Sequence, residues 1–284
     1  MIFFPNCKIN IGLEVIGKRG DGFHDIETFM FPVSGLCDIL EIVPGTNGVT
    51  FTASGIPVEG DPERNLCMRA WLLMAERYGV SGAKMHLHKA IPSRAGLGGG
   101  SSDAAFTIKG IDKLFSLGLP QQEMEELAAQ LGSDVPFFIS DTPQMASGRG
   151  DILTDCAAGL EKGTGLIIVK PEVSISTAEA YSNITPARPV ESLADRFARG
   201  IKSWKGTVAN AFEPYFFSVH PQLAGIKERL YEQGAVYASM SGSGSAFYGI
   251  FDGKTPAETE LSMNAAALAL KKEFGELFVY QQII

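Results

Sequence analysis

The sequence predicts an α+β protein of two domains, and three observations lead to this prediction. With 284 residues, the chain exceeds the roughly 100–200 residues of a common single domain. Its first half alternates strand-like runs with amphipathic helices, whereas its second half follows the order β-α-β-β-α-β, the ferredoxin-like arrangement. The segment 159–165 (GLEKGTG) is the strongest candidate linker. The expected domains therefore span residues 1–160 and 161–284.

The first strands are expected where β-branched and aromatic residues gather between clusters of Gly, Pro and Asp. These runs lie at residues 10–15, 25–31, 37–43 and 49–53. The segment 17–22, which holds three glycines, predicts a turn between the first two runs.

Helical spacing of apolar residues follows these strands. Leu66, Ala70 and Met74 recur on one face, which predicts a helix over 65–78 that ends at Gly79. The run 84–89 alternates apolar residues with histidines and predicts a strand. Two more helices are expected beyond a glycine-rich loop, one reaching about residue 117 and one from Pro120 to 131–132.

The second half predicts the ferredoxin-like order element by element. Strands are expected at 166–170, 235–239, 246–251 and 277–282, and helices at 221–233 and 256–274, with extra helical stretches before residue 199. The extra helices follow the first strand of the set.

Composition narrows the class of protein. Hydrophobic residues make up 45% and charged residues 20%, as in ordinary globular proteins. The formal charge of 24 − 32 = −8 disfavours a surface that neutralises nucleic-acid phosphates. The four cysteines form no CxxC pair, and no apolar leader or 18-residue apolar run occurs. We therefore expect a cytoplasmic protein with reduced thiols, no membrane contact and no nucleic-acid partner.

The glycine-rich loop is the strongest chemical signal. Its glycines at 96, 98, 99 and 100 fit neither a dinucleotide-binding G-x-G-x-x-G pattern nor a Walker A pattern, because Ser101 and Asp103 stand where glycines are needed and no Lys-Ser/Thr pair ends the loop. Glycines before a helix still let backbone amides approach an anion. The alternative is a glycine-rich turn capped by Ser101 or Ser102.

At this loop the chain resembles the GHMP superfamily of small-molecule kinases. The stretch PSRAGLGGGSSDAA at 92–105 is similar to the second motif of that superfamily, PNCKINIGL at 5–13 to the first, and MSGSGSA at 240–246 to the third. The resemblance covers nearly the whole chain. It implies an N-terminal α/β domain like ribosomal protein S5 and a C-terminal ferredoxin-like domain.

The resemblance also implies ATP as co-substrate and Mg²⁺ bridging its phosphates, and it leaves the metal ligands unknown. The expected ATP-binding residues are Pro92, Ser93, Arg94, Ala95, Gly96, Leu97, Gly98, Gly99, Gly100, Ser101 and Ser102.

The resemblance places catalysis on Lys8 and Asp134. Lys8 would offset developing charge, and Asp134 would accept or orient the proton of the attacked hydroxyl. Two alternatives stay open. Asp134 could cap a short helix at Val135-Pro136, and Lys8 could be a lysine that protects a sheet edge.

Further motifs point to one branch of the superfamily, whose substrate is a methylated sugar alcohol joined to cytidine diphosphate. These motifs are GFHDIET at 22–28, LGSDVPFF at 131–138 and PEVSISTAEAY at 171–181. The branch phosphorylates the 2-hydroxyl of that substrate to make isoprenoid precursors. The resemblance assigns substrate contacts to Asn10, Phe23, His24 and Tyr181, with the tyrosine stacking on the cytosine.

Two rival functions remain at this point. The chain could be a sister GHMP kinase acting on homoserine, a sugar or mevalonate, which would lack the base-binding residues at 23–24 and 181. It could also be a catalytically silent nucleotide-binding regulator, although both Lys8 and Asp134 are retained. The expected partners are small molecules only, for a monomer or homodimer.

Overall fold

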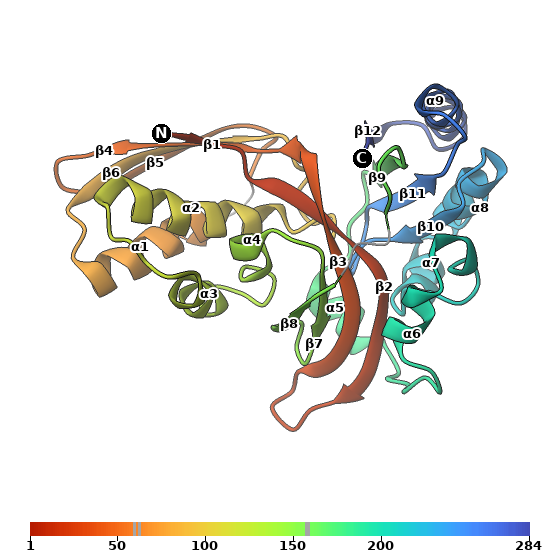
Figure 1. Cartoon of the computed structure of the whole chain (residues 1–284), viewed down its shortest axis with the longest axis horizontal. Coiled ribbons are helices and arrows are strands. Elements are labelled where there is room, and N and C mark those ends of the chain that lie inside the picture. The colour runs from red at the N-terminus through yellow and green to blue at the C-terminus, as the bar shows by residue number, and fades with distance from the viewer. Residues whose placement is uncertain (59–60, 62–63, 157–159) are drawn as a thin grey trace. The chain divides into compact units, whose positions relative to one another are not determined.

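The computed structural model describes residues 1–58, 61, 64–156 and 160–284. The chain forms two compact units whose segments alternate along the sequence (Figure 1). The first unit comprises Met1–Lys8, Pro32–Ser93 and Gly98–Thr142, and the second comprises Ile9–Phe31, Arg94–Leu97 and Pro143–Ile284. The long strands β2 (Asn6–Lys18) and β3 (His24–Cys37) contribute residues to both units.

The first unit is built on a four-stranded sheet with the order β1-β4-β6-β5. Its strands are β1 (Ile2–Phe3), β4 (Ile39–Pro44), β5 (Gly48–Gly55) and β6 (Gly82–Lys89). In this sheet β5 and β6 pair in parallel, whereas β4 pairs antiparallel with both β1 and β6. Burial alternates along β4, where Leu40 and Ile42 are fully buried and Ile39 is exposed, so this sheet buries one face.

Helices α1 (Leu66–Tyr78) and α2 (Gly99–Phe115) cover that buried face of the sheet (Figure 1). Helix α3 (Gln121–Ala129) and the short α4 (Phe137–Ser140) pack against α2 and against each other. Asn65 caps α1 by accepting a hydrogen bond from the Cys67 amide at 2.8 Å. Helix α2 lies close to β4, because a Cβ on Gly110 would come within 2.5 Å of the Ile42 Cδ1.

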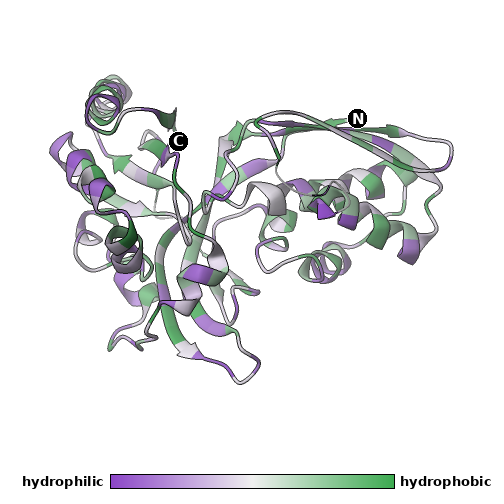
Figure 2. Ribbon diagram, turned by 180° about the vertical axis from the view of Figure 1, so that it is seen from behind, coloured by the Kyte–Doolittle hydropathy of each residue, from purple (hydrophilic) through white to green (hydrophobic). Residues whose placement is uncertain are grey.

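The second unit contains the predicted ferredoxin-like sheet. Strands β9 (Gly165–Pro171), β10 (Tyr237–Met240), β11 (Phe247–Phe251) and β12 (Leu277–Ile283) pair antiparallel in the order β10-β11-β9-β12. Helices α8 (Gly225–Glu232) and α9 (Pro256–Phe274) pack against it. Figure 2 shows mostly hydrophobic strands here and alternating hydrophobic and hydrophilic residues along α9. The β-α-β-β-α-β order is confirmed.

The second unit also holds a sheet with the order β2-β3-β7-β8, which uses β7 (Gln144–Ser147) and β8 (Ile152–Asp155). Short helices connect β9 to α8. They are α5 (Thr177–Ser182), α6 (Leu193–Ala198), η2 (Ile201–Ser203), α7 (Glu213–Val219) and η3 (Pro221–Leu223).

Several element predictions need correction. The strand expected over 37–43 is interrupted at Asp38, whose side chain is fully buried and hydrogen-bonded to other segments. The helix expected over 221–233 is divided into η3 and α8. Pro120 is the N-cap of α3 and not its first helical residue. The hairpin of β7 and β8 was not predicted, and Gly159 of the proposed linker lies outside the described residues.

Among the described helices, none combines the length and apolar character that crossing a membrane requires.

The central strand β9 allows a test of the second unit's core. Ile168 is fully buried, whereas Leu268 on α9 is 72% exposed. Ile168→Ala should lower the free energy of unfolding by about 2–5 kcal/mol, since it removes buried apolar atoms and leaves a cavity. Leu268→Ala should change it by less than about 0.5 kcal/mol. Urea denaturation measures both, and equal effects would contradict this packing.

Candidate active site

Helix α2 begins where the glycine-rich loop ends, and the N-terminus of this helix has the geometry of an anion-binding site. Its N-cap is Gly98, in a left-handed conformation with φ of 71°, and no side chain caps the helix. Ser101 and Ser102 lie inside the first turn, so the interpretation that either serine caps this turn is wrong. The first N–H groups of a helix have no acceptor within it. The start of α2 can therefore donate hydrogen bonds to an anion.

Close packing explains the glycine at position 98. A Cβ there would lie 2.9 Å from the Phe138 ring and 3.1 Å from the Lys8 Cε. The positive φ adds a second reason, because L-residues with a side chain rarely adopt it. Gly98 therefore brings the loop backbone directly against the Lys8 side chain.

The structure brings Lys8 and Asp134 together. The Lys8 Nζ lies 3.2 Å from the Asp134 Oδ2, and the two side chains are 3% and 35% exposed. Pro136, and not Asp134, is the N-cap of α4, and the helix has no side-chain cap. Both alternative interpretations are thus wrong, since Lys8 is also too buried to guard a sheet edge. A buried cation and an accessible carboxylate stand beside the start of α2.

Two further contacts hold the segment that carries Asp134. The Lys109 ammonium of α2 donates a hydrogen bond to the Phe138 carbonyl at 2.7 Å. Asn6 donates to the Asp141 carboxylate at 2.9 Å, and Asp141 ends α4. Burial lowers the pKa of Lys109 and raises the pKa of Asp141. Asn6 and Lys8 belong to the same strand, so α4 is attached to the strand that supplies the cation.

Oxygen atoms at the first turn of α2 fit a hard cation. The Ser102 Oγ is buried and has no hydrogen-bond partner among the described residues. Hydroxyl oxygen suits Mg²⁺, which is commonly held by few protein groups together with substrate phosphates. Ser102, with Ser101 beside it, is therefore compatible with a Mg²⁺–nucleotide complex.

A buried charged cluster that the sequence reasoning missed lies under the same loop. Lys89, Asp38 and Asp103 are each at most 4% exposed, and Lys89 forms ion pairs with both carboxylates. Burial raises the pKa of Asp103 to about 7, and Lys89 opposes that rise. The sequence does contain a signal for this cluster. Lys89 and Asp103 are charged residues next to apolar segments, and they stand on either side of the loop.

The other residues of the glycine-rich loop that are expected to bind ATP differ in their exposure to solvent. Pro92, Ala95 and Leu97 are buried, so only their backbone can meet a nucleotide, whereas Ser93 and Arg94 are exposed. Arg94 has a positive φ of 50°. Residues 94–97 belong to the second unit.

In that unit, the loop residue Gly96 contacts the segment that resembles the third motif. The Ser241 hydroxyl donates to the Gly96 carbonyl at 2.8 Å, and the Ala246 amide donates to the Ala95 carbonyl at 3.0 Å. A Cβ on Gly96 would lie 1.9 Å from the Ser241 carbonyl oxygen. Glycine is therefore required at position 96 for this contact.

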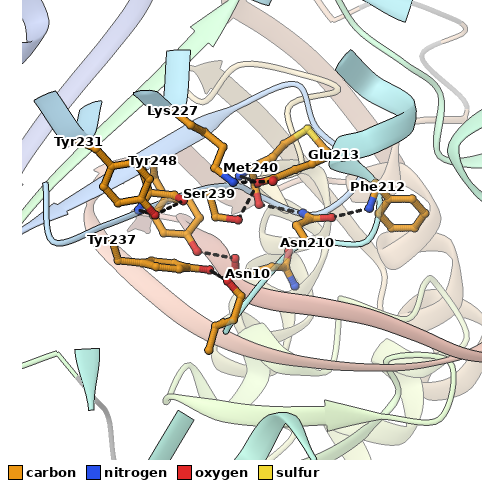
Figure 3. Close-up of polar contacts among 12 residues, drawn as sticks. Asn10, Asn210, Phe212, Glu213, Lys227, Tyr231, Tyr237, Ser239, Met240 and Tyr248 are labelled. Atoms are coloured by element: carbon orange, nitrogen blue, oxygen red, sulfur yellow. Dashed lines mark hydrogen bonds and ion pairs between the residues drawn. The ribbon is translucent and has the colours of Figure 1, made fainter. Parts of the chain in front are cut away.

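A buried polar network fixes the same segment from its other side (Figure 3). The Glu213 carboxylate accepts hydrogen bonds from the Ser239 hydroxyl and the Met240 amide, both at 2.9 Å. The Asn210 amide group donates to the Met240 and Gly242 carbonyls, both at 2.8 Å. Backbone groups that a tight turn leaves unpaired are thus satisfied by side chains.

Asn10 is held within the second unit by three hydrogen bonds. Its side chain donates to the Thr28 hydroxyl at 3.1 Å and is only 2% exposed. Its backbone N–H donates to the Ser241 hydroxyl at 3.1 Å, and its carbonyl accepts from the Tyr248 hydroxyl at 2.9 Å. These contacts favour a structural role for Asn10, and its substrate contact stays a prediction.

The structure brings His24 and Tyr181 into contact in the second unit. Their rings stack with centroids 5.1 Å apart and planes 24° apart, and the Tyr181 ring also meets the Phe212 edge at 4.9 Å. Phe23 is 53% exposed, and the Arg149 guanidinium lies 5.1 Å from its ring centroid. Of the three predicted base-binding residues, His24 and Tyr181 thus stack on one another, and Phe23 precedes His24 at the start of β3.

Two family models match this chain. The model for the GHMP kinases N terminal domain matches residues 65–142, and the model for the GHMP kinases C terminal region matches residues 190–273. The first match includes the motif at 92–105 and the second includes the motif at 240–246.

Curated relatives are similar over most of the chain. A protein of Azobacteroides pseudotrichonymphae named 4-diphosphocytidyl-2-C-methyl-D-erythritol kinase is 48% identical over 88% of this chain and 93% of its own length. A protein of the same name from Bacteroides thetaiotaomicron is 44% identical over 93% of this chain and 97% of its own length. The chain therefore belongs to the GHMP kinases, in the family of these 4-diphosphocytidyl-2-C-methyl-D-erythritol kinases.

Solved structures agree with this fold. The crystal structure of a 4-(cytidine 5'-diphospho)-2C-methyl-D-erythritol kinase matches with a TM-score of 0.77 and 30% identity, covering 99% of this chain and 98% of that one. Mevalonate kinase of Methanococcus jannaschii matches with a TM-score of 0.71 over 100% of this chain and 98% of its own, but at 14% identity it supports the fold alone. The two-domain GHMP kinase fold is thus confirmed.

The glycine at position 98 has a matched control in this chain. Gly118 has nearly the same φ, 70°, but nothing lies within 4 Å of an added Cβ. Gly118→Ala should lower the free energy of unfolding by about 1 kcal/mol and leave ATP affinity unchanged. Gly98→Ala should carry the same strain and also weaken ATP binding, because Lys8 and Phe138 must move. Titration calorimetry with ATP compares them, and equal affinities would contradict the role of Gly98.

Proposed function

We propose that this chain transfers the γ-phosphoryl group of ATP to the 2-hydroxyl of 4-diphosphocytidyl-2-C-methyl-D-erythritol, the cytidyl substrate, and so makes an isoprenoid precursor. The observation that carries the proposal is the Lys8–Asp134 pair beside Gly98 at the start of α2. This arrangement sets an anion-binding helix start, a cation and a carboxylate next to one another.

Phosphoryl transfer to an alcohol requires little covalent chemistry from a protein. It requires an oriented hydroxyl, a group that accepts its proton, and positive charge near the equatorial oxygens of the transferred group. Asp134, at 35% exposure, accepts or orients the proton of the hydroxyl. Lys8, whose side chain is 3% exposed, supplies a positive charge that bulk water barely screens.

The start of α2 holds the phosphates in this proposal. Backbone N–H groups from Gly99 onward donate to phosphate oxygens, and the helix dipole favours the negative charge. Mg²⁺, when bound with ATP, would neutralise part of the phosphate charge, and the buried Ser102 hydroxyl is the described oxygen that would help to hold it.

The stacked rings of His24 and Tyr181 take the cytosine. Stacking on a base tolerates any base, so selectivity for cytosine falls to hydrogen bonds from the His24 region. His24 occupies one face of Tyr181, with ring centroids 5.1 Å apart. We infer that the cytosine binds between the His24 and Tyr181 rings, which must move apart to admit it.

The remaining expectations belong to the same proposal. The net charge of −8 supports small-molecule partners without nucleic acid, and the absence of a CxxC pair supports a cytoplasmic enzyme, as a monomer or homodimer. We also propose that residues 1–160 form the ATP-binding and catalytic domain and residues 161–284 the ferredoxin-like substrate domain, with Phe23 and His24 contributed to base binding from the first range.

An ADP-release assay tests the activity directly. The purified full chain should release ADP with the cytidyl substrate and with neither homoserine, galactose nor mevalonate. Turnover of one of those three, with none of the cytidyl substrate, would overturn the substrate assignment.

Asp134→Asn tests the proton acceptor. The amide keeps the size of the side chain but cannot accept the proton as a carboxylate does, so kcat should fall by roughly 10²–10⁴-fold. ATP affinity and the thermal midpoint should stay near those of the unmodified protein. A nearly unchanged kcat would refute the role of Asp134.

Tyr181→Ala tests the base-binding stack, with Tyr215→Ala as its control. Loss of one stacking face should raise KM for the cytidyl substrate by about 5- to 150-fold, the equivalent of about 1–3 kcal/mol, and leave KM for ATP unchanged. Both tyrosines pack on one hydrophobic cluster, but only Tyr181 stacks on His24. If both variants raise both KM values alike, Tyr181 is only a core aromatic.

A further inference from the structure

Lys89 joins the two ends of the glycine-rich loop through buried charge. It is the last residue of β6, so the loop begins at the next residue. Its Nζ forms an ion pair with Asp38 and lies 2.7 Å from the Asp103 Oδ2, in the first turns of α2. The loop from 90 to 98 is thus closed at both ends by one ammonium group.

Asp38 adds direct contacts to the loop backbone. Its Oδ1 accepts hydrogen bonds from the Ala90 amide at 2.6 Å and the Ile91 amide at 2.9 Å. One carboxylate therefore binds the first two loop N–H groups with one oxygen and the Lys89 ammonium with the other. Asp38 lies at the interruption between β3 and β4, and its side chain is fully buried.

The ammonium group also lies close to the expected phosphate position. A Cβ added to Gly99, the first residue of α2, would be 3.4 Å from the Lys89 Nζ. The cation is therefore placed beneath the helix start that we assign to the phosphates. Burial would lower the pKa of Lys89, but the two carboxylates outweigh it and raise the pKa, so the group stays protonated.

Burying three charges is costly, and such clusters often add little to stability. Hydrophobic residues of similar volume could fill the space of these three side chains at no loss in stability. They could not replace the hydrogen bond that joins Lys89 to Asp103, or the bonds that Asp38 accepts from the loop backbone. This contrast indicates that the cluster serves the geometry of the loop.

We propose that Lys89, with Asp38 and Asp103, forms a positioning cluster that holds the glycine-rich loop and the start of α2 in the geometry that binds the ATP phosphates. The inference rests on the proposed function, because that function assigns ATP to this loop. The cluster acts through the backbone of the loop and touches no substrate itself.

Two variants of the full chain test the cluster. Asp103→Asn is nearly isosteric and keeps an oxygen for Lys89 while removing the charge, and Lys89→Met removes the ammonium with little change in length. Each should raise the Kd for ATP by about 10-fold or more, because Asp103→Asn removes one charge from the ion pair with Lys89, and Lys89→Met removes the ion pairs with both carboxylates. The Kd for the cytidyl substrate should stay within about 3-fold.

The control is Arg196→Met, which breaks a partly buried ion pair with Glu14 in the second unit, where the two side chains are 12% and 14% exposed. It should lower the thermal midpoint and leave both Kd values unchanged. This comparison separates a positioning role from a purely structural one, which would shift the midpoint without a selective loss of ATP binding.

Calorimetric titration of each folded variant with ATP and with the cytidyl substrate decides the matter. An unchanged Kd for ATP in Asp103→Asn, or equal weakening of both ligands, would overturn the inference. If Lys89→Met does not fold, Asp103→Asn alone decides. Failure of the unmodified chain to bind ATP would instead refute the proposed function, so the two failures are distinguishable.

Discussion

Backbone amides can hold a phosphate only where no side chain stands between them and the ligand, and much of the first unit follows from that constraint. Gly98 supplies the left-handed turn that starts α2, and its missing Cβ lets Lys8 and Phe138 pack against the loop. Lys8 then meets Asp134 at 3.2 Å. The contact between Lys8 and Asp134, the pair that we propose for catalysis, thus depends on the absence of a Cβ at position 98.

Buried polar groups recur wherever the two units need a defined backbone. In the first unit, Lys89, Asp38 and Asp103 surround the start of the glycine-rich loop. In the second unit, Glu213 and Asn210 satisfy the backbone of the segment around Met240 (Figure 3). Such groups are costly to bury and become destabilising when one partner is lost, so they specify one geometry where apolar packing would tolerate several.

The chain binds anionic ligands although its own net charge is −8. Screening in water limits the reach of exposed charges to about 8 Å at physiological salt, so distant carboxylates matter little at a local site. The start of α2 carries no acidic residue in its first turn, and Lys8 is buried beside it. The N–H groups at the start of α2 and the Lys8 ammonium therefore determine the affinity for a small anion. The net charge of −8 instead disfavours large polyanionic partners.

The sequence by itself determined the order of most elements and the glycine-rich loop. Local spacing encodes these features, since helices and strands repeat at 3.6 and 2 residues and glycine marks the turns. Lys8 and Asp134 were chosen from the resemblance of their motifs to the GHMP kinases, because spacing alone left other roles open for both. The sequence did not reveal the hairpin of β7 and β8, the break at Asp38 or the cluster around Lys89. Only the tertiary structure decided these, because each depends on distant partners: 51 residues separate Lys89 from Asp38, and β7 pairs with the much earlier strand β3 as well as with β8. For the same reason the contact between His24 and Tyr181 became visible only once the chain was folded.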